Sequence, residues 1–448
     1  MKDLLLNSSR HNNPKISQKF YFIFFIFIFI FSFLIPAEAR VYIQIDQASE
    51  KKFPIAVVDL VPVNRGTSKD WNHEITDIII DDLKLTGLFE IIPPNQYPTS
   101  PGALLTNPAS IQFPPWTLIG AQALINGSYS NTKGGMQVEL NLYDPFLGQH
   151  LVSRSYITKD SERAVVANHF ADEVVKELTG ERGVFSTQIA YTQIVKKGKE
   201  IGVMTMNGGN AHNITKDKSI NLSPAWTPNG SQIVYTSFGR NASPEITIVG
   251  SEGGPSRRIT SNGSINVSPT FTPHGVLTVV SALEGDTEIY LMNMAGNIIK
   301  RITNSFGIDV NPCWSPDGSS LVFASERAGR LHIFRSDASG GSVERLTFVG
   351  TQNDNPVWSP KGDKIAFQSL DGNWDIFLMN TDGSMIQRLT SSTGNNESPT
   401  WAPNGRFIAY SSTRNGPVEV TLMREDGSNQ ITIGPSGSTQ PTWGPWVK

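Results

Sequence analysis

Cysteine is almost absent from this sequence, since Cys313 is the only one among 448 residues. A single thiol cannot form an internal disulfide, and no group of cysteine and histidine has the spacing of a metal site. Charged residues make up only 17% of the chain, with a formal net charge of −3, and we find no Lys/Arg cluster of the kind that binds nucleic acid. We therefore expect neither a metal, nor a cofactor, nor a nucleic-acid partner.

Catalytic signatures are also missing from the sequence. There is no Gly-x-Ser-x-Gly nucleophile turn, no phosphate-binding Gly-x-x-x-x-Gly-Lys and no His-Glu-x-x-His. Cys313 occupies a strand position that other repeats fill with alanine, threonine or valine, which indicates an inert strand residue. We predict no catalytic residues and no enzymatic activity.

One long apolar run is present, and it lies near the start of the chain. Residues 20–35 are apolar except for Ser32, basic residues precede them, and the run is followed by Ala37-Glu-Ala39. This order predicts a secretory signal peptide, residues 1–39, that is cleaved after Ala39. An uncleaved membrane anchor is the alternative, but the run is shorter than the roughly 20 residues that cross a bilayer. We expect an exported protein that is soluble after cleavage.

A repeated phrase dominates the second half of the sequence. Its form is polar-Pro-x-(Trp/Phe)-x-Pro-x-Gly, and the sixth copy is truncated. The copies occupy residues 223–230, 268–275, 311–318, 355–362, 398–405 and 440–445. A period in the low forties is the length of one four-stranded propeller blade, and each Asn-Gly or Asp-Gly pair predicts a tight hairpin turn.

The two ends of the repeat region complement each other. The last copy has no strands after it, whereas residues 186–206 supply later strands with no phrase before them. We expect the C-terminal strand to complete the first blade, because this overlap removes open sheet edges. The fold class predicted is an α/β N-terminal domain, residues 40–180, followed by an all-β six-bladed β-propeller of four-stranded blades, residues 184–448.

The N-terminal domain shows alternating strand and helix patterns. Strands are predicted at 54–59, 88–92, 121–129, 136–143 and 151–156, and helices at 68–85 and 161–178. In the second helix, Val166, Phe170, Val174 and Leu178 are four residues apart, and Gly180 ends it. Ahead of the domain, Val41, Ile43 and Ile45 alternate with polar residues, so this segment pairs within its own domain or adds to another protein's sheet edge.

Two polar positions precede the first proline of each repeated phrase. The minus-three set comprises Asn221, Asn266, Asp309, Asn353, Asn396 and Ser438, and the minus-one set comprises Ser223, Ser268, Asn311, Asn355, Ser398 and Gln440. Because the first strand of a blade is innermost, we expect both sets to ring one mouth of the central channel. They either cap turns there or form a nearly uncharged polar ring that binds a partner by hydrogen bonds.

The repeated phrase, the junction Ala171–Tyr191 and the expected mature start resemble the TolB family of Gram-negative bacteria over essentially the whole mature chain. The resemblance implies a periplasmic component of the Tol–Pal envelope system that acts in outer-membrane integrity and in division. It implies that the propeller mouth binds the lipoprotein Pal, and that TolA and other inner-membrane Tol proteins are further partners. It implies a monomer, peripheral to membranes, whose N-terminal domain and mature N-terminal segment engage the inner-membrane Tol proteins, chiefly TolA. That segment comprises Arg40, Val41, Tyr42, Ile43, Gln44, Ile45 and Asp46.

A second class of function stays open at this point. A periplasmic propeller can also bind or process a small molecule or a peptide in its central channel, as an enzyme or as a sensor. Such propellers place carboxylates or histidines around the channel, whereas the two polar sets are mostly amides and hydroxyls. The residues inside the channel therefore distinguish the two hypotheses.

Overall fold

The computed structural model describes residue 43 and residues 52–64, 71–98, 111–239, 243–261, 263–391 and 394–446. The predicted signal peptide lies outside these ranges, as does the segment 40–46 apart from Ile43. The described residues from 52 onward belong to one compact unit. Within the described ranges, no helix combines the length and the apolar character needed to cross a membrane.

The first part of the unit is a mixed sheet with helices. Its strand order is β3-β1-β4-β5-β6, with β2 beside β4; β1 is parallel to β3 and β4, whereas β4, β5 and β6 are antiparallel. The elements are β1 (Phe53–Val57), β2 (Val61–Pro62), α2 (Trp71–Thr86), β3 (Phe89–Ile91), η1 (Pro94–Gln96), α3 (Pro114–Leu118), β4 (Ala123–Thr132), β5 (Gly135–Asp144), β6 (Gln149–Thr158), η4 (Asp160–Glu162) and α4 (Arg163–Thr179).

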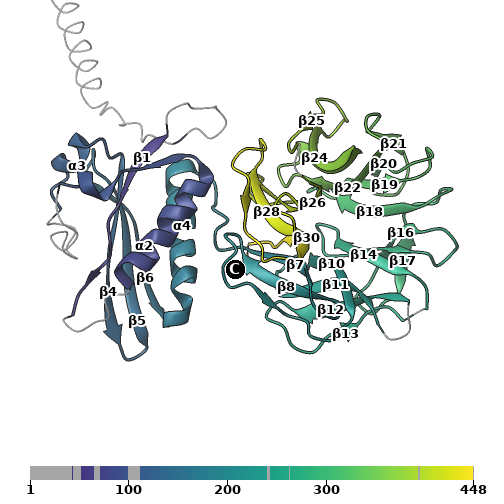
Figure 1. Ribbon diagram of the computed structural model, residues 1–448, viewed down its shortest axis with the longest axis horizontal. Coiled ribbons are helices and arrows are strands. Elements are labelled where there is room, and N and C mark those ends of the chain that lie inside the picture. Colours follow the sequence, from purple (N-terminus) through teal and green to yellow (C-terminus); the bar gives the residue numbers. More distant parts are fainter. Residues whose placement is uncertain are drawn as a thin grey trace, which may run out of the picture. The chain divides into compact units, whose positions relative to one another are not determined.

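The two long helices lie side by side on one face of this sheet (Figure 1). In α2, Trp71, Ile75, Ile79 and Leu83 are buried at four-residue spacing, which places them on one helical stripe. In α4 the predicted residues 166, 170, 174 and 178 are all buried, and Gly180 ends the helix in the left-handed conformation at φ 78°. On the other face, Trp116 of α3 packs against buried strand residues.

The second part of the unit consists of antiparallel strands in groups of four. Four groups are separate sheets, and two groups join into one eight-stranded sheet through the single pair Ile220 and Lys199. The joined groups are β30 (Ser438–Trp443), β7 (Gln188–Ile194), β8 (Lys199–Thr205), β9 (His212–Asn213), and β10 (Ile220–Trp226), β11 (Gln232–Phe238), β12 (Pro244–Gly250), β13 (Arg257–Arg258).

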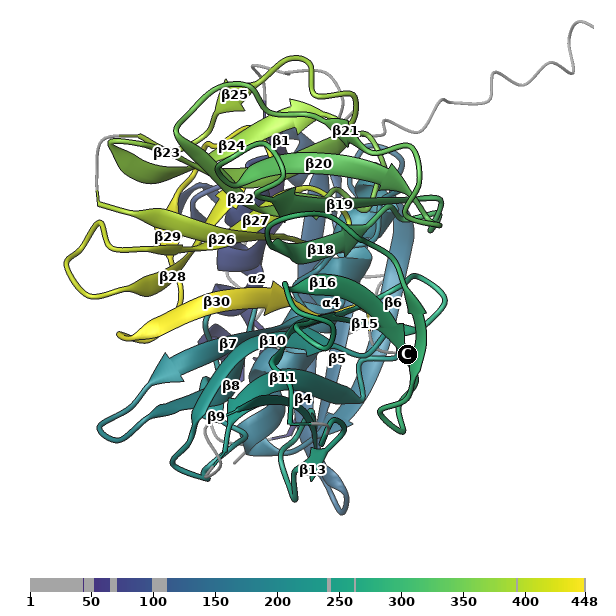
Figure 2. The same ribbon diagram turned by 90° about the vertical axis from the view of Figure 1, so that its right-hand side faces the viewer.

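The separate sheets follow one another along the chain. They are β14 (Asn266–Phe271), β15 (Leu277–Ser281), β16 (Glu288–Met292), β17 (Ile298–Arg301); β18 (Asp309–Trp314), β19 (Ser320–Ser325), β20 (His332–Asp337), β21 (Glu344–Arg345); β22 (Gln352–Trp358), β23 (Lys364–Asp371), β24 (Asn373–Asn380), β25 (Gln387–Arg388); and β26 (Asn396–Trp401), β27 (Phe407–Ser412), β28 (Glu419–Arg424), β29 (Ile431–Thr432). Figure 2 shows the sheets set around a common centre, with strands such as β18, β22 and β30 toward the middle.

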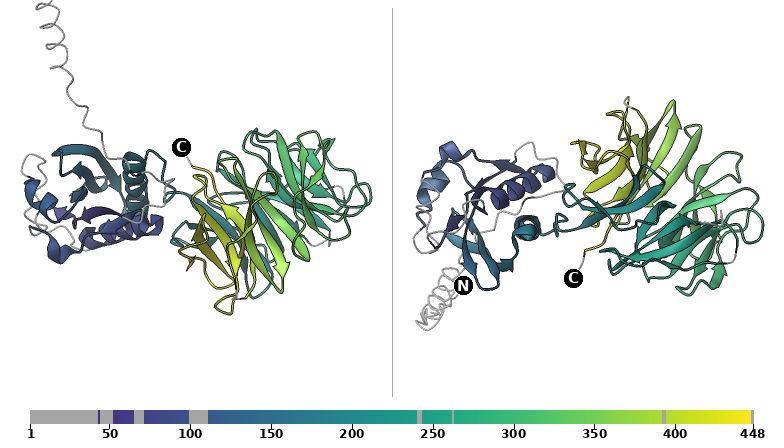
Figure 3. Two further views of the ribbon diagram at one scale, coloured as in Figure 1. Left: turned by 90° about the horizontal axis from the view of Figure 1, so that it is seen from above. Right: turned by 60° about the horizontal axis from the view of Figure 1, so that its bottom comes forward.

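Apolar cores fill the spaces between neighbouring sheets. One core combines Val234 and Ile246 of one sheet with Leu277, Val279 and Met292 of the next. Figure 3 shows the same sheets from two further directions, as successive layers. Sheets that pack face to face around an axis form a β-propeller, so we refer to each four-stranded group as a blade.

The chain's last strand lies where the repeat predicted it. Strand β30 pairs antiparallel with β7, with Ser438 opposite Gln193 and Trp443 opposite Ile189, and Figure 2 shows the two strands side by side. Trp443 is 7% exposed, and its indole N–H donates to Thr187 Oγ1 at 2.8 Å. The predicted pairing of the C-terminal strand with the first strand of the repeat region is therefore confirmed.

Candidate functional site

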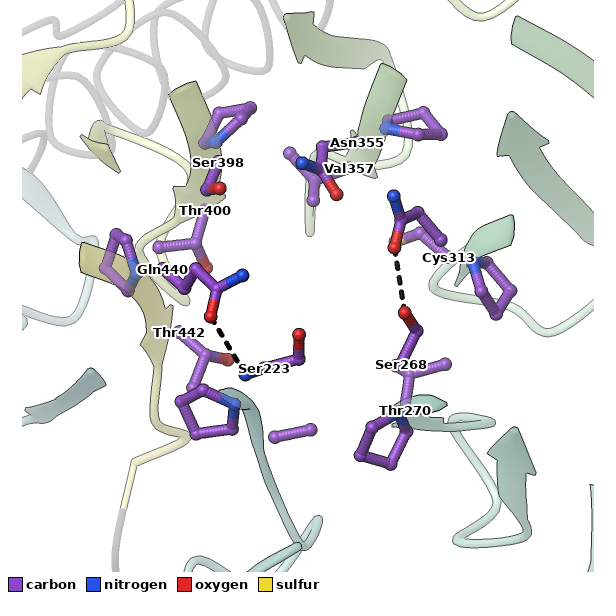
Figure 4. Close-up of a pocket in the computed structure, with 18 residues that line it drawn as sticks. Ser223, Ser268, Thr270, Cys313, Asn355, Val357, Ser398, Thr400, Gln440 and Thr442 are labelled. Carbon is purple, nitrogen blue, oxygen red and sulfur yellow. Dashed lines mark hydrogen bonds between the residues drawn. The ribbon is translucent and has the colours of Figure 1, made fainter. Parts of the chain in front are cut away.

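The minus-one set lines a cavity at the centre of the propeller. The cavity has a volume of about 170 Å³ and is bounded by three consecutive residues from every copy of the repeated phrase. Figure 4 shows Ser223, Ser268, Asn355, Ser398 and Gln440 around its open centre. The structure therefore brings the minus-one set together, as the sequence predicted.

An unusual backbone conformation positions these side chains. All six residues of the minus-one set have φ between 47° and 54°, in the left-handed region that non-glycine residues rarely adopt. The register of each innermost strand shifts at the same place, as in a β-bulge. Hydrogen bonds to neighbouring blades hold the conformation: the Ser268 amide donates to Thr236 Oγ1 at 3.2 Å and the Ser398 amide to Gln368 Oε1 at 2.7 Å.

A chain of hydrogen bonds joins three neighbouring blades across the cavity wall. The Ser268 hydroxyl donates to Asn311 Oδ1 at 3.0 Å, and Asn311 Nδ2 donates to Asp354 Oδ1 at 2.9 Å. On the opposite side, the Ser223 amide donates to Gln440 Oε1 at 3.1 Å. Since hydrogen bonds fix the amide orientations, the wall presents a defined pattern of donors and acceptors.

The expected placement of the minus-three set at the mouth is wrong. All six of its side chains are 0% exposed, because each one belongs to a buried polar cluster rather than to the cavity wall. Asn396 is representative: its Nδ2 donates to Asp375 Oδ1 at 3.0 Å and its Oδ1 accepts from the Ser412 hydroxyl at 2.8 Å. Buried amides require such partners, so these residues support the fold beneath the mouth.

Two carboxylates next to the minus-one set were not predicted from the sequence. Asp354 and Glu397 directly precede Asn355 and Ser398 of the minus-one set, at a position where the other four copies carry Leu, Val, Val and Thr. Burial raises the pKa of Asp354, and burial together with the negative charge of Asp354 raises the pKa of Glu397. In the sequence, the sign of these two carboxylates is an acidic residue immediately before the minus-one position in two of the six copies.

Cys313 also lines the cavity. Its Sγ accepts a hydrogen bond from the Trp358 amide at 3.3 Å, and burial raises the pKa of the thiol to about 11. A thiol with a raised pKa is a poor nucleophile. Among the residues that the structure describes, no group of three histidine, cysteine or acidic side chains is arranged to hold a metal ion.

Fold and site together define a β-propeller protein with a polar central cavity. Residues 175–447 match the TolB beta propeller domain, and residues 41–151 match the TolB amino-terminal domain. The chain belongs to the TolB family.

Individual relatives agree with this assignment. A protein of Desulfosudis oleivorans described as "Tol-Pal system protein TolB" is 34% identical over 253 residues, which are 56% of this chain and 57% of that protein. The chain therefore matches little more than half the length of this curated relative. The crystal structure of TolB from Acinetobacter baumannii is 26% identical, covers 90% of this chain and 98% of its own, and superimposes with a TM-score of 0.76. A chain in the crystal structure of a nidogen/laminin complex shares the fold alone, at 13% identity and a TM-score of 0.50, over 58% of this chain and 100% of its own.

Proposed function

We propose that this protein is a non-enzymatic, periplasmic component of the Tol–Pal envelope system whose propeller binds Pal at the mouth lined by the minus-one set. The observation that carries the proposal is the cavity itself, where six polar side chains from six copies of one phrase converge. Membership of the TolB family and the TolB relative named as a Tol-Pal system protein support the cellular role.

The size and chemistry of the cavity favour a protein partner over a small molecule. A volume of about 170 Å³ is below the roughly 300–1,000 Å³ of small-molecule pockets. The oriented amides and hydroxyls suit hydrogen bonds to a peptide backbone or to polar side chains of a partner. Asp354 and Glu397 add acidic character, but no nucleophile and base lie within reach of each other in the cavity wall that the structure describes.

The proposal extends to the whole chain. It comprises a signal peptide at 1–39, an N-terminal domain at 40–180 and a six-bladed propeller at 184–448. In this proposal, the segment Arg40–Asp46 engages TolA, while the propeller engages Pal, so that the protein links the inner-membrane Tol proteins to the outer membrane. Loss of the protein then weakens the outer membrane and its constriction during division.

Binding to the purified periplasmic domain of Pal tests the site directly. Ser268→Arg and Asn355→Arg introduce bulky charge at the mouth, where both side chains line the cavity. We expect each variant to weaken binding at least about 30-fold, the effect of losing one binding hot spot. His274→Arg is the matched control, because His274 is exposed in the hairpin turn after β14, away from the minus-one position.

The control variant should bind Pal within about threefold of the unchanged protein. Circular dichroism melting curves verify that all three variants are folded. Pal binding that survives in both mouth variants would place the Pal site elsewhere on the chain. A separate variant that lacks residues 40–46 should lose TolA in the same type of assay and keep Pal.

A further inference from the structure

Five lysines gather on two neighbouring loops at one end of the blade formed by β30, β7, β8 and β9. Lys196, Lys197 and Lys199 belong to the connection from β7 into β8, and Lys216 and Lys218 belong to the connection from β9 to β10. We call these five residues the lysine patch. The expectation that the protein has no Lys/Arg cluster is wrong: Lys196, Lys197 and Lys199 lie within four consecutive positions, and folding brings Lys216 and Lys218 beside them.

Backbone contacts hold the two loops together. The Lys199 amide donates to the Ser219 carbonyl at 2.9 Å, and Lys199 pairs with Ile220. A side chain at Gly198 would collide with the Ser219 carbonyl, so this close approach requires glycine. The Lys218 amide donates to Glu200 Oε1 at 2.9 Å, which holds Lys218 at φ 59°. The lysine patch is therefore a fixed feature of this blade.

Two carboxylates lie near the patch, the buried Glu200 and the exposed Asp217, and both accept hydrogen bonds from groups outside the patch. Glu200 is 4% exposed and also accepts from the Thr215 hydroxyl at 2.5 Å. Asp217 Oδ1 accepts from the Ser219 amide at 3.0 Å and from Asn221 Nδ2 at 2.9 Å. None of the ion pairs in the described part of the chain includes a residue of the lysine patch.

Exposure makes this charge available to a partner. Four of the five lysines are exposed and Lys199 is half-buried, although the chain as a whole has a formal net charge of −3. Two exposed aliphatic side chains flank the patch, since Ile194 at the end of β7 and Ile220 at the start of β10 are each 45% exposed. Positive charge and apolar groups are thus combined on one small surface.

A cavity of about 510 Å³ opens beside Lys218. Lys218 and Arg258 provide positive charge in its wall, Asp217 provides one carboxylate, and the remaining polar lining residues carry hydroxyl groups. The Ser219 and Ser237 hydroxyls donate within the protein, to the Phe238 carbonyl and to Asn221 Oδ1, so the two cations are the groups in this wall that suit an anionic headgroup. The cavity therefore extends the positive charge of the patch from Lys218 to Arg258, with Asp217 as the one acidic group in its wall.

From this geometry we infer that the lysine patch docks the protein on a membrane surface rich in anionic lipid headgroups. Protein–protein interfaces are enriched in aromatic residues and arginine and depleted in lysine, whereas the two loops carry lysine and no aromatic residue or arginine. Clustered lysines are attracted to anionic bilayers, and flanking aliphatic side chains can enter the headgroup region. This inference goes beyond the proposed function and does not depend on Pal binding.

Vesicle co-sedimentation tests the inference with protein purified from the periplasm of an expressing Gram-negative host. Vesicles contain phosphatidylglycerol and phosphatidylcholine, or phosphatidylcholine alone. Each lysine near an anionic surface contributes about a fivefold increase in partitioning. We expect the variant K196Q/K197Q/K216Q/K218Q to lose at least about 100-fold in partitioning to the anionic vesicles.

The variant K52Q/K133Q/K159Q/K300Q is the matched control, since it removes four exposed lysines elsewhere on the chain and changes the net charge equally. It should partition within about threefold of the unchanged protein. Binding should also weaken from about 0.1 M to about 1 M salt, because the Debye length falls from about 10 Å to about 3 Å.

Three results would overturn the inference. The first is equal binding to anionic and neutral vesicles, and the second is wild-type partitioning by the lysine-patch variant. The third is complete release from the vesicles by millimolar inorganic phosphate at constant ionic strength, which would identify a phosphate site rather than a membrane surface. Pal affinity measured on the lysine-patch variant should be unchanged, so failure of this inference leaves the proposed function standing.

Discussion

Trp443 offers a direct test of whether β30 is an integral strand of the propeller. Its side chain is 7% exposed and its indole N–H donates to Thr187 Oγ1 at 2.8 Å. Truncation of a buried tryptophan to alanine costs about 3–5 kcal/mol, and loss of the hydrogen bond accounts for about 0.5–1.5 kcal/mol of this. We expect Trp443→Ala to lower the free energy of unfolding by about 3–5 kcal/mol, measured by urea denaturation followed by far-ultraviolet circular dichroism.

Trp401 provides the matched comparison. It occupies the same place in the repeated phrase, on β26, is also 7% exposed, and its indole N–H donates to the Val357 carbonyl at 3.2 Å. Trp401→Ala should therefore cost the same as Trp443→Ala to within about 1 kcal/mol. A cost below about 1 kcal/mol for Trp443→Ala, beside the full cost for Trp401→Ala, would refute the reasoning, because it would show that β30 is not held in its blade.

Two further predictions follow from perturbed side chains. Burial and the positive charge of Arg345 lower the pKa of His332, whose Nδ1 accepts from Asn353 Nδ2 at 3.0 Å. Protonation therefore favours the unfolded state, and stability should fall as the pH drops below about 6.5, the ordinary histidine value. Urea midpoints measured at neutral and at acidic pH should fall less for His332→Gln than for the unchanged protein, and an equal fall in both proteins would contradict this. In Asp354→Asn, the negative charge that raises the pKa of Glu397 is removed, so the carboxyl of Glu397 should titrate at lower pH, as measured by carbon-detected NMR. An unchanged titration midpoint would show that the two carboxyl groups are not coupled.

The repeat made much of the fold predictable. Its period predicted the four-stranded groups, and the unmatched phrase at its end predicted the pairing of β30 with β7. The helices were also visible as stripes of apolar residues at four-residue spacing, because a helix packed on a sheet buries one face. These features depend on local pattern and on chain order, which a single sequence contains.

The candidate site was predictable only in part. The sequence identified the polar positions before the first proline, but it could not show that a β-bulge separates their environments. Without the bulge, Asn266 and Ser268 would point the same way along an extended strand. In the structure Asn266 is buried, whereas Ser268 lines the cavity. The shift of register therefore decides which of the two residues a partner can touch.

Interactions between distant segments were the least predictable. The lysine patch depends on the contact of Lys199 with Ser219 and Ile220, and the coupling of Asp354 with Glu397 depends on two neighbouring blades. Lys196, Lys197 and Lys199 are close in the sequence, but their meeting with Lys216 and Lys218, like the coupling of the two carboxylates, requires the three-dimensional placement of separate loops or strands. Such sites are found when the charges of a folded surface are considered together.

The pairing of β30 with β7 also constrains how the protein is made. Strands β7, β8 and β9 lie at the start of the repeat region and β30 lies at its end, so a chain that begins to fold from its amino end leaves the edge of β7 unpaired until the last strand joins it. Closure over so long a span is slow relative to hairpin formation. A chain truncated before β30 would keep that edge open to proteases and to aggregation, so the last strand to join also protects the first blade.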